Sequence, residues 1–330
     1  MRLAAALASL AALSTVPLSG AAGERWEPTR PIQLVVPAGQ GGGADQMARA
    51  IQSIVAQHRM TPRPIVVVHK PGGAGAEAFL ETKAAHGNPH VLLITLSNLF
   101  TTPLATGIPF SWRDLTPVTM LALDEFVLWV NAEAPYTTVA EFLAAARASR
   151  LRIGGTGSRQ EDQLIAAAIT RATGIDFAYL PYAGGGTVAA ALAGRHVDAT
   201  VNNPIEAVTH WRVGVLRPLC VFDSKRLAAS LPVTDSEGWH DIPSCREAGL
   251  AVDYVMPRAL FMASGVTEAQ VAFYTELIER VRETPEWHAL MREGAFRQSS
   301  MSGAPLAAWL AEEEERHRAL MVEAGFIPAR

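Results

Sequence analysis

The chain has 330 residues, a formal net charge of −4 and two cysteines. Its Lys and Arg residues are dispersed, with no basic run longer than two, which argues against nucleic acid or an anionic membrane surface as a partner. A chain of this length exceeds what one hydrophobic core usually supports, so we expect two lobes.

Residues 1–22 are typical of a cleavable secretory signal peptide. Arg2 supplies one positive charge, residues 3–16 form an apolar run, and small residues follow at 19–23. The run is shorter and richer in alanine than a transmembrane helix, which needs about 20 strongly apolar residues. We therefore expect cleavage after Ala22, or one residue earlier, and a periplasmic location.

Short apolar segments alternate with helical patterns, which predicts an α/β fold with mostly parallel sheets. We expect residues 23–125 to begin the first lobe, 126–224 to form the second, and 225–330 to complete the first and add the C-terminal helices. The expected strands are residues 32–36, 65–68, 91–95, 126–130, 151–153, 177–180, 199–201, 216–222, 252–255 and 259–262. The expected helices are residues 45–57, 74–85, 138–148, 160–173, 186–193, 205–212, 267–283, 285–292 and 303–323.

Four glycine-rich turns each follow an expected strand and precede an expected helix. They are GQGGGAD at 39–45, PGGAGA at 71–76, GGTGSRQ at 154–160 and PYAGGGT at 181–187. Open α/β sheets bind ligands at the carboxyl ends of their strands, where glycine lets backbone N–H groups approach an anion. Helix N-termini add partial positive charge there. The four turns together predict a site for a small anion.

A dinucleotide site is one alternative, because Gly39, Gly41 and Ala44 match the pattern GxGxxA after a strand. The second expected strand, however, ends at His69 and Lys70, where an acidic residue would bind the ribose. An exported protein also meets little NAD. We therefore expect no nucleotide, metal or other cofactor.

A hydrolase acting on a small carboxylate ester is the main alternative function. Ser158 could serve as a nucleophile, but the sequence shows no general base for it, although a partner could come from anywhere in the chain. The patterns GxSxG, GxxxxGK[ST] and HExxH are absent from the sequence, as is a Cys/His cluster with zinc spacing.

The two cysteines and three of the tryptophans each allow two interpretations. Cys220 and Cys245 either form a disulfide, which an oxidising compartment permits, or remain two buried thiols. Trp129, Trp211 and Trp239 either pack in the core or wall a site for an aromatic acid, and we favour the core.

Six sequence blocks occur in the order found in one family of transport receptors. They are PAGQGGGADQMARAIQ, VVVHKPGGAGAEAFL, NPHVLLIT, RDLTPVTML, YLPYAGGGTVAAALAGRHVDATV and TPEWHALM. The chain thereby resembles, over essentially its whole mature length, the substrate-binding proteins of tripartite tricarboxylate transporters, the Bug or TctC-like family.

The resemblance implies a type II periplasmic-binding-protein fold, in which two α/β lobes joined by crossing strands close over a ligand cleft. We expect a monomeric receptor without enzymatic activity. The ligand would be a small di- or tricarboxylate, or an aromatic carboxylate. It would be delivered to a membrane transporter made of one large and one small subunit. We expect the crossings near residues 123–126 and 222–225 to act as hinges, because the strand series changes lobe there.

Ligand contacts are carried over from the family by position. In the first lobe they are Gln40, Gly41, Gly42, Gly43, Ala44, Asp45, Gly73, Ser97 and Asn98; in the second they are Thr156, Gly157, Ser158, Arg159, Gln160, Tyr182, Gly184 and Asn202.

Three of these positions carry separate expectations. The side chain of Asp45 should cap a helix and pair with Arg49, because it would repel a ligand carboxylate. Arg159 lies where this chain departs from the family, and either binds a second carboxylate or faces solvent. A β-carbon at Gly42 should block the ligand or break a turn with positive φ.

Overall fold

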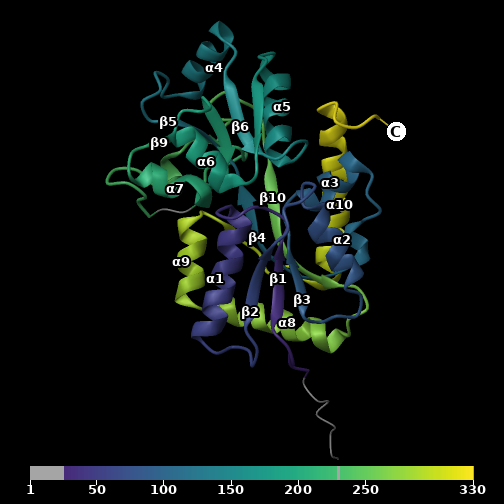
Figure 1. The fold of residues 1–330 in the computed structure, drawn as a ribbon. Coiled ribbons are helices and arrows are strands. Elements are labelled where there is room, and N and C mark those ends of the chain that lie inside the picture. Colours follow the sequence, from purple (N-terminus) through teal and green to yellow (C-terminus); the bar gives the residue numbers. More distant parts are fainter. Residues whose placement is uncertain (1–25, 229–230, 330) are drawn as a thin grey trace, which may run out of the picture.

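The protein, in a computed structural model that describes residues 26–228 and 231–329, is built from two α/β lobes (Figure 1). The predicted signal peptide, residues 1–22, lies outside the described residues. Each lobe is organised around one sheet: six strands in the order β11-β4-β10-β3-β1-β2 and five in the order β7-β6-β8-β5-β9. The α/β class expected from the sequence is confirmed.

The first sheet has a parallel half and an antiparallel half. Strand β1 pairs in parallel with β2 and with β3, as the alternation of strands and helices predicts, whereas β10 runs antiparallel to β3 and β4. The short β11 pairs antiparallel with β4 at the edge. The strands of this sheet are β1 (Ile32–Val36), β2 (Ile65–His69), β3 (Val91–Ile94), β4 (Leu115–Glu125), β10 (Val255–Ala263) and β11 (Arg297–Gln298).

Helices cover both faces of this sheet, and α1 shows why. Its apolar residues Met47, Ala48, Ile51, Ile54 and Val55 recur at helical spacing and are all buried. The helices of the first lobe are α1 (Gly43–Gln57), α2 (Ala76–Ala84), α3 (Asn98–Thr106), α8 (Glu268–Arg282), α9 (Pro285–Glu293) and α10 (Gly303–Glu323), with a 3₁₀ turn η1 (Trp112–Asp114).

The second sheet, like the first, has a parallel part and an antiparallel part. Strand β6 pairs in parallel with β7 and β8, while β5 runs antiparallel to β8 and β9. Its strands are β5 (Val127–Asn131), β6 (Arg152–Thr156), β7 (Ala178–Tyr182), β8 (Ala199–Asn202) and β9 (Leu216–Val221). Its helices are α4 (Val139–Ala148), α5 (Glu161–Thr173), α6 (Gly185–Ala193) and α7 (Pro204–Arg212), with a 3₁₀ turn η2 (Trp239–Asp241).

Four strands and α-helices differ from the sequence prediction, among them the short edge strand β11, which was not predicted. Strand β4 and helix α3 were not predicted; α3 contains Pro103, which reads as a helix break in a sequence. The segments expected at 252–255 and 259–262 form the single strand β10, whose pattern is interrupted by Pro257 and Arg258. Arg258 is accommodated in a buried strand because it pairs with Asp124 on β4.

The chain crosses between the lobes at Phe126, directly between β4 and β5. After β9, however, the chain stays on the second lobe: Ser244 forms a parallel bridge with Val221, and β10 re-enters the first sheet only at Val255. The lobe boundary at 224/225 stays a prediction, and this packing favours a later boundary, at the start of β10.

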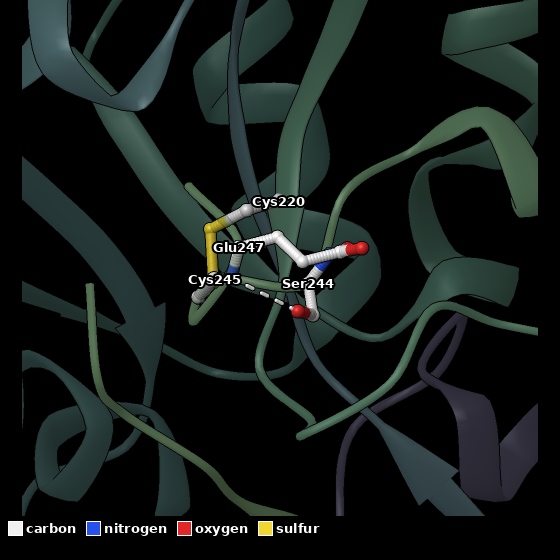
Figure 2. Close-up of a disulfide and its surroundings, with 4 residues drawn as sticks. All are labelled: Cys220, Ser244, Cys245 and Glu247. Carbon is white, nitrogen blue, oxygen red and sulfur yellow. Dashed lines mark hydrogen bonds between the residues drawn. A yellow bond between two sulfur atoms is a disulfide. The ribbon is translucent and has the colours of Figure 1, made fainter. Parts of the chain in front are cut away.

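A disulfide fixes this returning segment to β9. The sulfur atoms of Cys220 and Cys245 are bonded, so of the two interpretations the structure supports the disulfide. Figure 2 shows the turn beside it, in which the Glu247 amide donates to Ser244 Oγ at 3.1 Å and the Ser244 amide donates to Glu247 Oε2 at 2.8 Å.

The three tryptophans form one buried cluster. The ring of Trp239, on η2, lies 6.0 Å from Trp129 and 4.8 Å from Trp211, measured between ring centroids. All three side chains are buried. The expectation that they pack in the core is confirmed.

Candidate functional site

The glycine-rich loops meet where the carboxyl ends of the parallel strands of one lobe face those of the other (Figure 1). A cavity of about 470 Å³ lies between them. It is lined by Pro37, Ala38, Pro71, Gly72, Ala74, Leu96 and Asn98 of the first lobe and by Thr156, Gly157, Ser158, Gln160, Glu161, Tyr182 and Ala183 of the second. Both lobes thus contribute to one wall, as a cleft that closes over a solute requires.

The structure divides the predicted ligand residues into two groups. Asn98, Thr156, Gly157, Ser158, Gln160 and Tyr182 line the cavity. Its wall does not include Gln40, Gly41, Gly42, Gly43, Ala44, Asp45, Gly73, Ser97, Arg159, Gly184 or Asn202. The lining residues that sequence reasoning missed flank the same loops, and the one with chemical character is Glu161, the first residue of α5.

The first glycine loop contacts the opposite lobe. The Gly41 amide donates to Asp45 Oδ2 at 2.8 Å, and the Gly43 amide donates across the cleft to Glu206 Oε1 at 2.9 Å. These two amides therefore bind carboxylates of the chain itself. That they bind a ligand carboxylate stays a prediction.

Close neighbours from both lobes explain why this loop is rich in glycine. A β-carbon at Gly39 would lie 2.9 Å from the Ala183 carbonyl oxygen, and one at Gly43 would lie 2.5 Å from Arg258 Nη2. Gly41 has φ +78°, which favours glycine. Gly42 has φ −77°, so the expectation of a turn with positive φ at Gly42 is wrong.

Asp45 has a structural role, as expected, although it does not occupy the N-cap. Helix α1 begins at Gly43 with Gly42 in the N-cap position, so Asp45 lies in the first turn. Its Oδ1 lies 2.7 Å from Arg49 Nε and 2.7 Å from His69 Nε2. Burial raises the pKa of Asp45, but the Gly41 amide, His69 and Arg49 together hold it below its ordinary value.

The carbonyl of Ala74 joins the two lobes at the cavity wall. It accepts hydrogen bonds from Gln160 Nε2 of the second lobe at 3.1 Å, from Asn98 Nδ2 at 3.3 Å and from Thr102 Oγ1 at 2.7 Å. Together with the bond between Gly43 and Glu206, this contact joins the two lobes beside the cavity.

Buried charges lie beneath the loops. Arg258 donates to Asp124 Oδ2 through Nε at 2.9 Å and through Nη2 at 2.7 Å, and both side chains are fully buried. Burial raises the pKa of Glu161 to about 7, and it raises the pKa of Asp162 well above its ordinary value. One Oδ of Asp162 accepts from the Thr156 amide at 2.6 Å.

The wall of the cavity offers backbone and neutral polar groups rather than cations. None of the described residues that line it is Lys, Arg or His, and the one carboxylate is that of Glu161. Helices α3, α5 and α6 begin at or beside this wall, so their N-termini supply partial positive charge. Such a site can bind a carboxylate through amides without a guanidinium or ammonium partner.

Arg159 and Ser158 were each expected to have a role at this cavity. Arg159 is exposed, with φ 57°, and its backbone amide donates to Gln163 Oε1 at 2.6 Å. Its exposure favours the solvent-facing alternative, and a contact with a second carboxylate stays a prediction. Ser158 lines the cavity, but none of the described lining residues is a histidine that could serve as its base.

The structure also contains a second cavity, outside the predicted ligand site. A larger cavity, of about 590 Å³, lies beside α9 and is lined by Glu125, Asp223, Ser224, Lys225, Arg226, Leu227, Ala228, His288, Met291, Arg292, Ala295, Phe296 and Arg297. It includes none of the predicted ligand residues. Across residues 26–228 and 231–329, His, Cys, Asp and Glu side chains form no group of three or more that could hold a metal ion.

Two α/β lobes that meet over a cavity are the architecture of solute-binding proteins. The chain belongs to the tripartite tricarboxylate transporter family of receptors, because the family model TctC, described as "Tripartite tricarboxylate transporter family receptor", matches residues 46–326. Its members are receptors rather than enzymes, and the hydrolase alternative finds no support.

Relatives and solved structures agree with this membership. The UPF0065 protein in the gbd 5' region of Cupriavidus necator is 25% identical over 308 residues, covering 92% of this chain and 90% of the relative. A TctC solute-binding protein from Polaromonas, solved without ligand, is 26% identical with a TM-score of 0.64, covering 89% of this chain and 98% of that one.

Two further structures were solved with an acid bound. The Rhodopseudomonas palustris protein solved with adipate is 22% identical with a TM-score of 0.81, covering 90% of this chain and 98% of that one. MatC of the same species, solved with malate, is 22% identical with a TM-score of 0.75, covering 89% of this chain and 99% of that one. At this identity they show the shared fold, and the type II two-lobed architecture is confirmed.

Proposed function

We propose that this receptor captures a small organic acid in the 470 Å³ cavity and delivers it to a membrane transporter of the tripartite type. The observation that carries the proposal is the cavity itself, closed by both lobes and surrounded by the N-termini of α3, α5 and α6. The structural neighbours solved with adipate and malate support a carboxylate ligand.

Binding depends on backbone geometry in this proposal. Each amide or hydroxyl donor contributes about 0.5–1.5 kcal/mol net, and about 1.5–3 kcal/mol when the acceptor is charged, so a few donors give useful affinity. Closure excludes water from the cavity, and it presents a surface to the transporter that spans both lobes. The open form would release the contacts of Gly43 with Glu206 and of Ala74 with Gln160.

The hinge belongs to the crossing strands. The Phe222 amide donates to the Phe126 carbonyl at 2.8 Å, and the Tyr254 amide donates to the Phe222 carbonyl at 2.8 Å. The chain crosses between the lobes at Phe126 and again at Tyr254, and Phe222 joins these two positions by hydrogen bonds, which supports hinge motion about Phe126 and Tyr254 rather than about the predicted crossing at 222–225. A scattering curve that is the same with and without saturating ligand would count against closure.

The proposed function also requires export of the receptor to the periplasm. Receptors of this family are periplasmic, and among the described residues no helix is long and apolar enough to cross a membrane. We propose cleavage after Ala22, which the intact mass of the protein recovered from the periplasm would reveal. A mass that includes Met1 would contradict it.

A ligand screen on the mature chain tests the function. Thermal shift would be measured with succinate, malate, adipate, citrate and benzoate, and each hit would be confirmed by calorimetry. A bound acid should stabilise the fold by about 2.7 kcal/mol at a hundredfold excess over Kd. The acid must be recovered unchanged. Turnover of a carboxylate ester that Ser158→Ala abolishes would instead establish the hydrolase.

A further inference from the structure

The cavity of about 590 Å³ beside α9 differs in its chemistry from the cleft that holds the predicted ligand residues. Its wall contains four Lys and Arg side chains, whereas the described residues that line the cleft include none. Its carboxylates are the two of Glu125 and Asp223. An anion attracted to this cationic wall is therefore a different kind of ligand from one that the cleft would hold through backbone amides.

Both lobes contribute to the wall of this cavity. Residues 223–228 follow β9 on the second lobe, where Arg226 Nε donates to Glu247 Oε2 at 3.0 Å. The opposite wall is α9 of the first lobe, which lies directly below α7 of the second lobe in Figure 1. Trp239 Nε1, on η2, donates to the Glu293 carbonyl at the end of α9 at 3.2 Å. These contacts hold the two walls in place, so the cavity has a defined shape.

The exposed part of the wall is basic, and the buried part is apolar. Three basic side chains, which we call the basic rim, are exposed and have no ion pair or hydrogen bond among the described residues: Lys225, His288 and Arg292. The buried apolar floor is formed by Leu227, Met291 and Phe296. Two fixed positive charges and a histidine around one opening suit a dianion better than a monocarboxylate. A phosphate monoester carries close to two negative charges at pH 7 and offers three acceptor oxygens.

An unpaired oxygen lies in the buried part of the wall. Glu125 is 2% exposed, and its Oε1 lies 3.2 Å from Arg297 Nη2, but its Oε2 has no hydrogen-bond partner among the described residues. Unpaired buried polar atoms are rare in proteins. Burial raises the pKa of Glu125 to about 8, so near neutral pH both of its protonation states are accessible. The group donates when protonated and accepts when ionised, and a hydroxyl group on a ligand satisfies it in either state.

We propose that the cavity beside α9 is a second binding site, which takes the phosphate monoester of a small polyol. The phosphate contacts the basic rim, the carbon chain lies on the apolar floor, and a hydroxyl group pairs with Glu125 Oε2. This inference is independent of the proposed function, because none of the predicted ligand residues lines this cavity.

Isothermal titration calorimetry with three matched compounds tests the site on the mature protein. The compounds are glycerol 3-phosphate, glycerol, which lacks the phosphate, and n-propyl phosphate, which lacks the hydroxyl groups. Glycerol 3-phosphate should bind and glycerol should not, because glycerol has no charge to pair with the basic rim. The affinity for n-propyl phosphate should be at least about fivefold weaker than for glycerol 3-phosphate, because it leaves Glu125 Oε2 unpaired.

Variants show whether the phosphate is bound in this cavity. Arg292→Gln and Lys225→Gln should each weaken the binding of glycerol 3-phosphate by at least about tenfold, because each removes a charge-assisted contact. Arg147→Gln is the matched control, since Arg147, like Arg292, is an exposed basic residue in the last turn of a helix. Its affinity should stay within about twofold of the wild type.

A variant of the buried carboxyl tests the hydroxyl contact. Glu125→Leu should reduce the preference for glycerol 3-phosphate over n-propyl phosphate to within about twofold, because it removes the group that distinguishes the two compounds. If this variant does not fold, the comparison of the two phosphates on the wild type still tests the contact.

The results can overturn the inference without touching the receptor function. If glycerol 3-phosphate does not bind, or if Arg292→Gln and Lys225→Gln bind it like the wild type, the second site is overturned. Equal affinities of the wild type for glycerol 3-phosphate and n-propyl phosphate would overturn the pairing with Glu125 and the polyol class. The acid screen tests the proposed function separately, because it concerns the cleft.

Discussion

The carboxylate of Glu206 accepts a hydrogen bond from the backbone amide of Gly43 at 2.9 Å, and so joins α7 of the second lobe to α1 of the first. Its other oxygen accepts from Asn202 Nδ2 at 2.9 Å and from the Asn203 amide at 3.1 Å. The positive end of α1 is thus occupied by a carboxylate of the chain in the closed form.

Glu206→Gln should weaken this connection. The variant replaces one acceptor oxygen by a donor, so at least one of the three donors loses its partner. A hydrogen bond to a charged group contributes about 1.5–3 kcal/mol, and we expect the free energy of unfolding to fall by about that amount. Urea denaturation would measure it, with Glu315→Gln as the matched exposed control. Equal midpoints for Glu206→Gln and the wild type would show that the contact contributes nothing.

Gly39→Ala should separate the lobes. The added carbon would lie 2.9 Å from the carbonyl oxygen of Ala183, and both groups belong to backbone that cannot yield easily. The closed form is therefore disfavoured, and the affinity for ligand should fall by roughly tenfold or more. Small-angle scattering should report a larger radius of gyration.

Gly42→Ala is the control for this experiment. Its added carbon meets Glu206 Oε1 at 3.4 Å, an ordinary contact, and φ is −77°. Contrary to the expectation from the sequence that a β-carbon at Gly42 blocks the ligand, Gly42→Ala should therefore scatter and bind like the wild type. If Gly39→Ala gives the same scattering curve and affinity as Gly42→Ala, the loop does not set the distance between the lobes.

Reduction of the disulfide should destabilise the second lobe. Cys220 and Cys245 are 25 residues apart, and closing a loop of this length contributes about 3.5 kcal/mol in the chain-entropy estimate. The double variant Cys220→Ala with Cys245→Ala should lose about this much stability and should no longer respond to a reductant. A wild type whose denaturation midpoint is insensitive to reductant would contradict the prediction.

His317 should make stability depend on pH on the acid side. Its Nδ1 donates to the Glu313 carbonyl at 2.7 Å and its Nε2 accepts from the Tyr254 hydroxyl at 2.9 Å; burial lowers its pKa from 6.5 to about 4. Between these values the unfolded chain binds a proton that the folded chain does not. Stability fully present above pH 6.5 is therefore lost as the pH falls to 4, by about 3 kcal/mol.

The comparison with His317→Gln isolates this contribution, because other groups titrate over the same range in both proteins. Urea denaturation at pH 4 and pH 7 should give a difference in stability that is about 3 kcal/mol larger for the wild type. Equal differences for the two proteins would show that His317 is not held neutral by the fold.

The sequence predicted the elements whose patterns are regular and missed those set by contacts across the fold. Strand β1 matches its predicted bounds because four of its five residues are apolar and buried. Strand β10 was divided because Pro257 and Arg258 interrupt its apolar pattern, and the Asp124 partner that lets Arg258 be buried lies far away in the sequence.

In the candidate site, too, the sequence predicted residues near recognisable motifs and missed contacts between distant segments. Gln160 and Tyr182 lie in glycine-rich turns and Asn98 follows the third expected strand, and the resemblance to the family assigned all three to the ligand site. The structure brings them to one cavity. The contact of Gly43 with Glu206 could not be foreseen, because it depends on how the lobes meet. Glu161 looks like an ordinary acidic residue at a helix start until its burial is known.

A crystal structure of the mature protein with the acid that gives the largest thermal shift tests the central claim most directly. The account predicts the acid in the cavity between the lobes, with its carboxylate within hydrogen-bond distance of the Thr156 to Gln160 loop and in contact with Asn98 and Tyr182. An acid bound instead in the cavity beside α9, against Arg226 and Arg297, would contradict it.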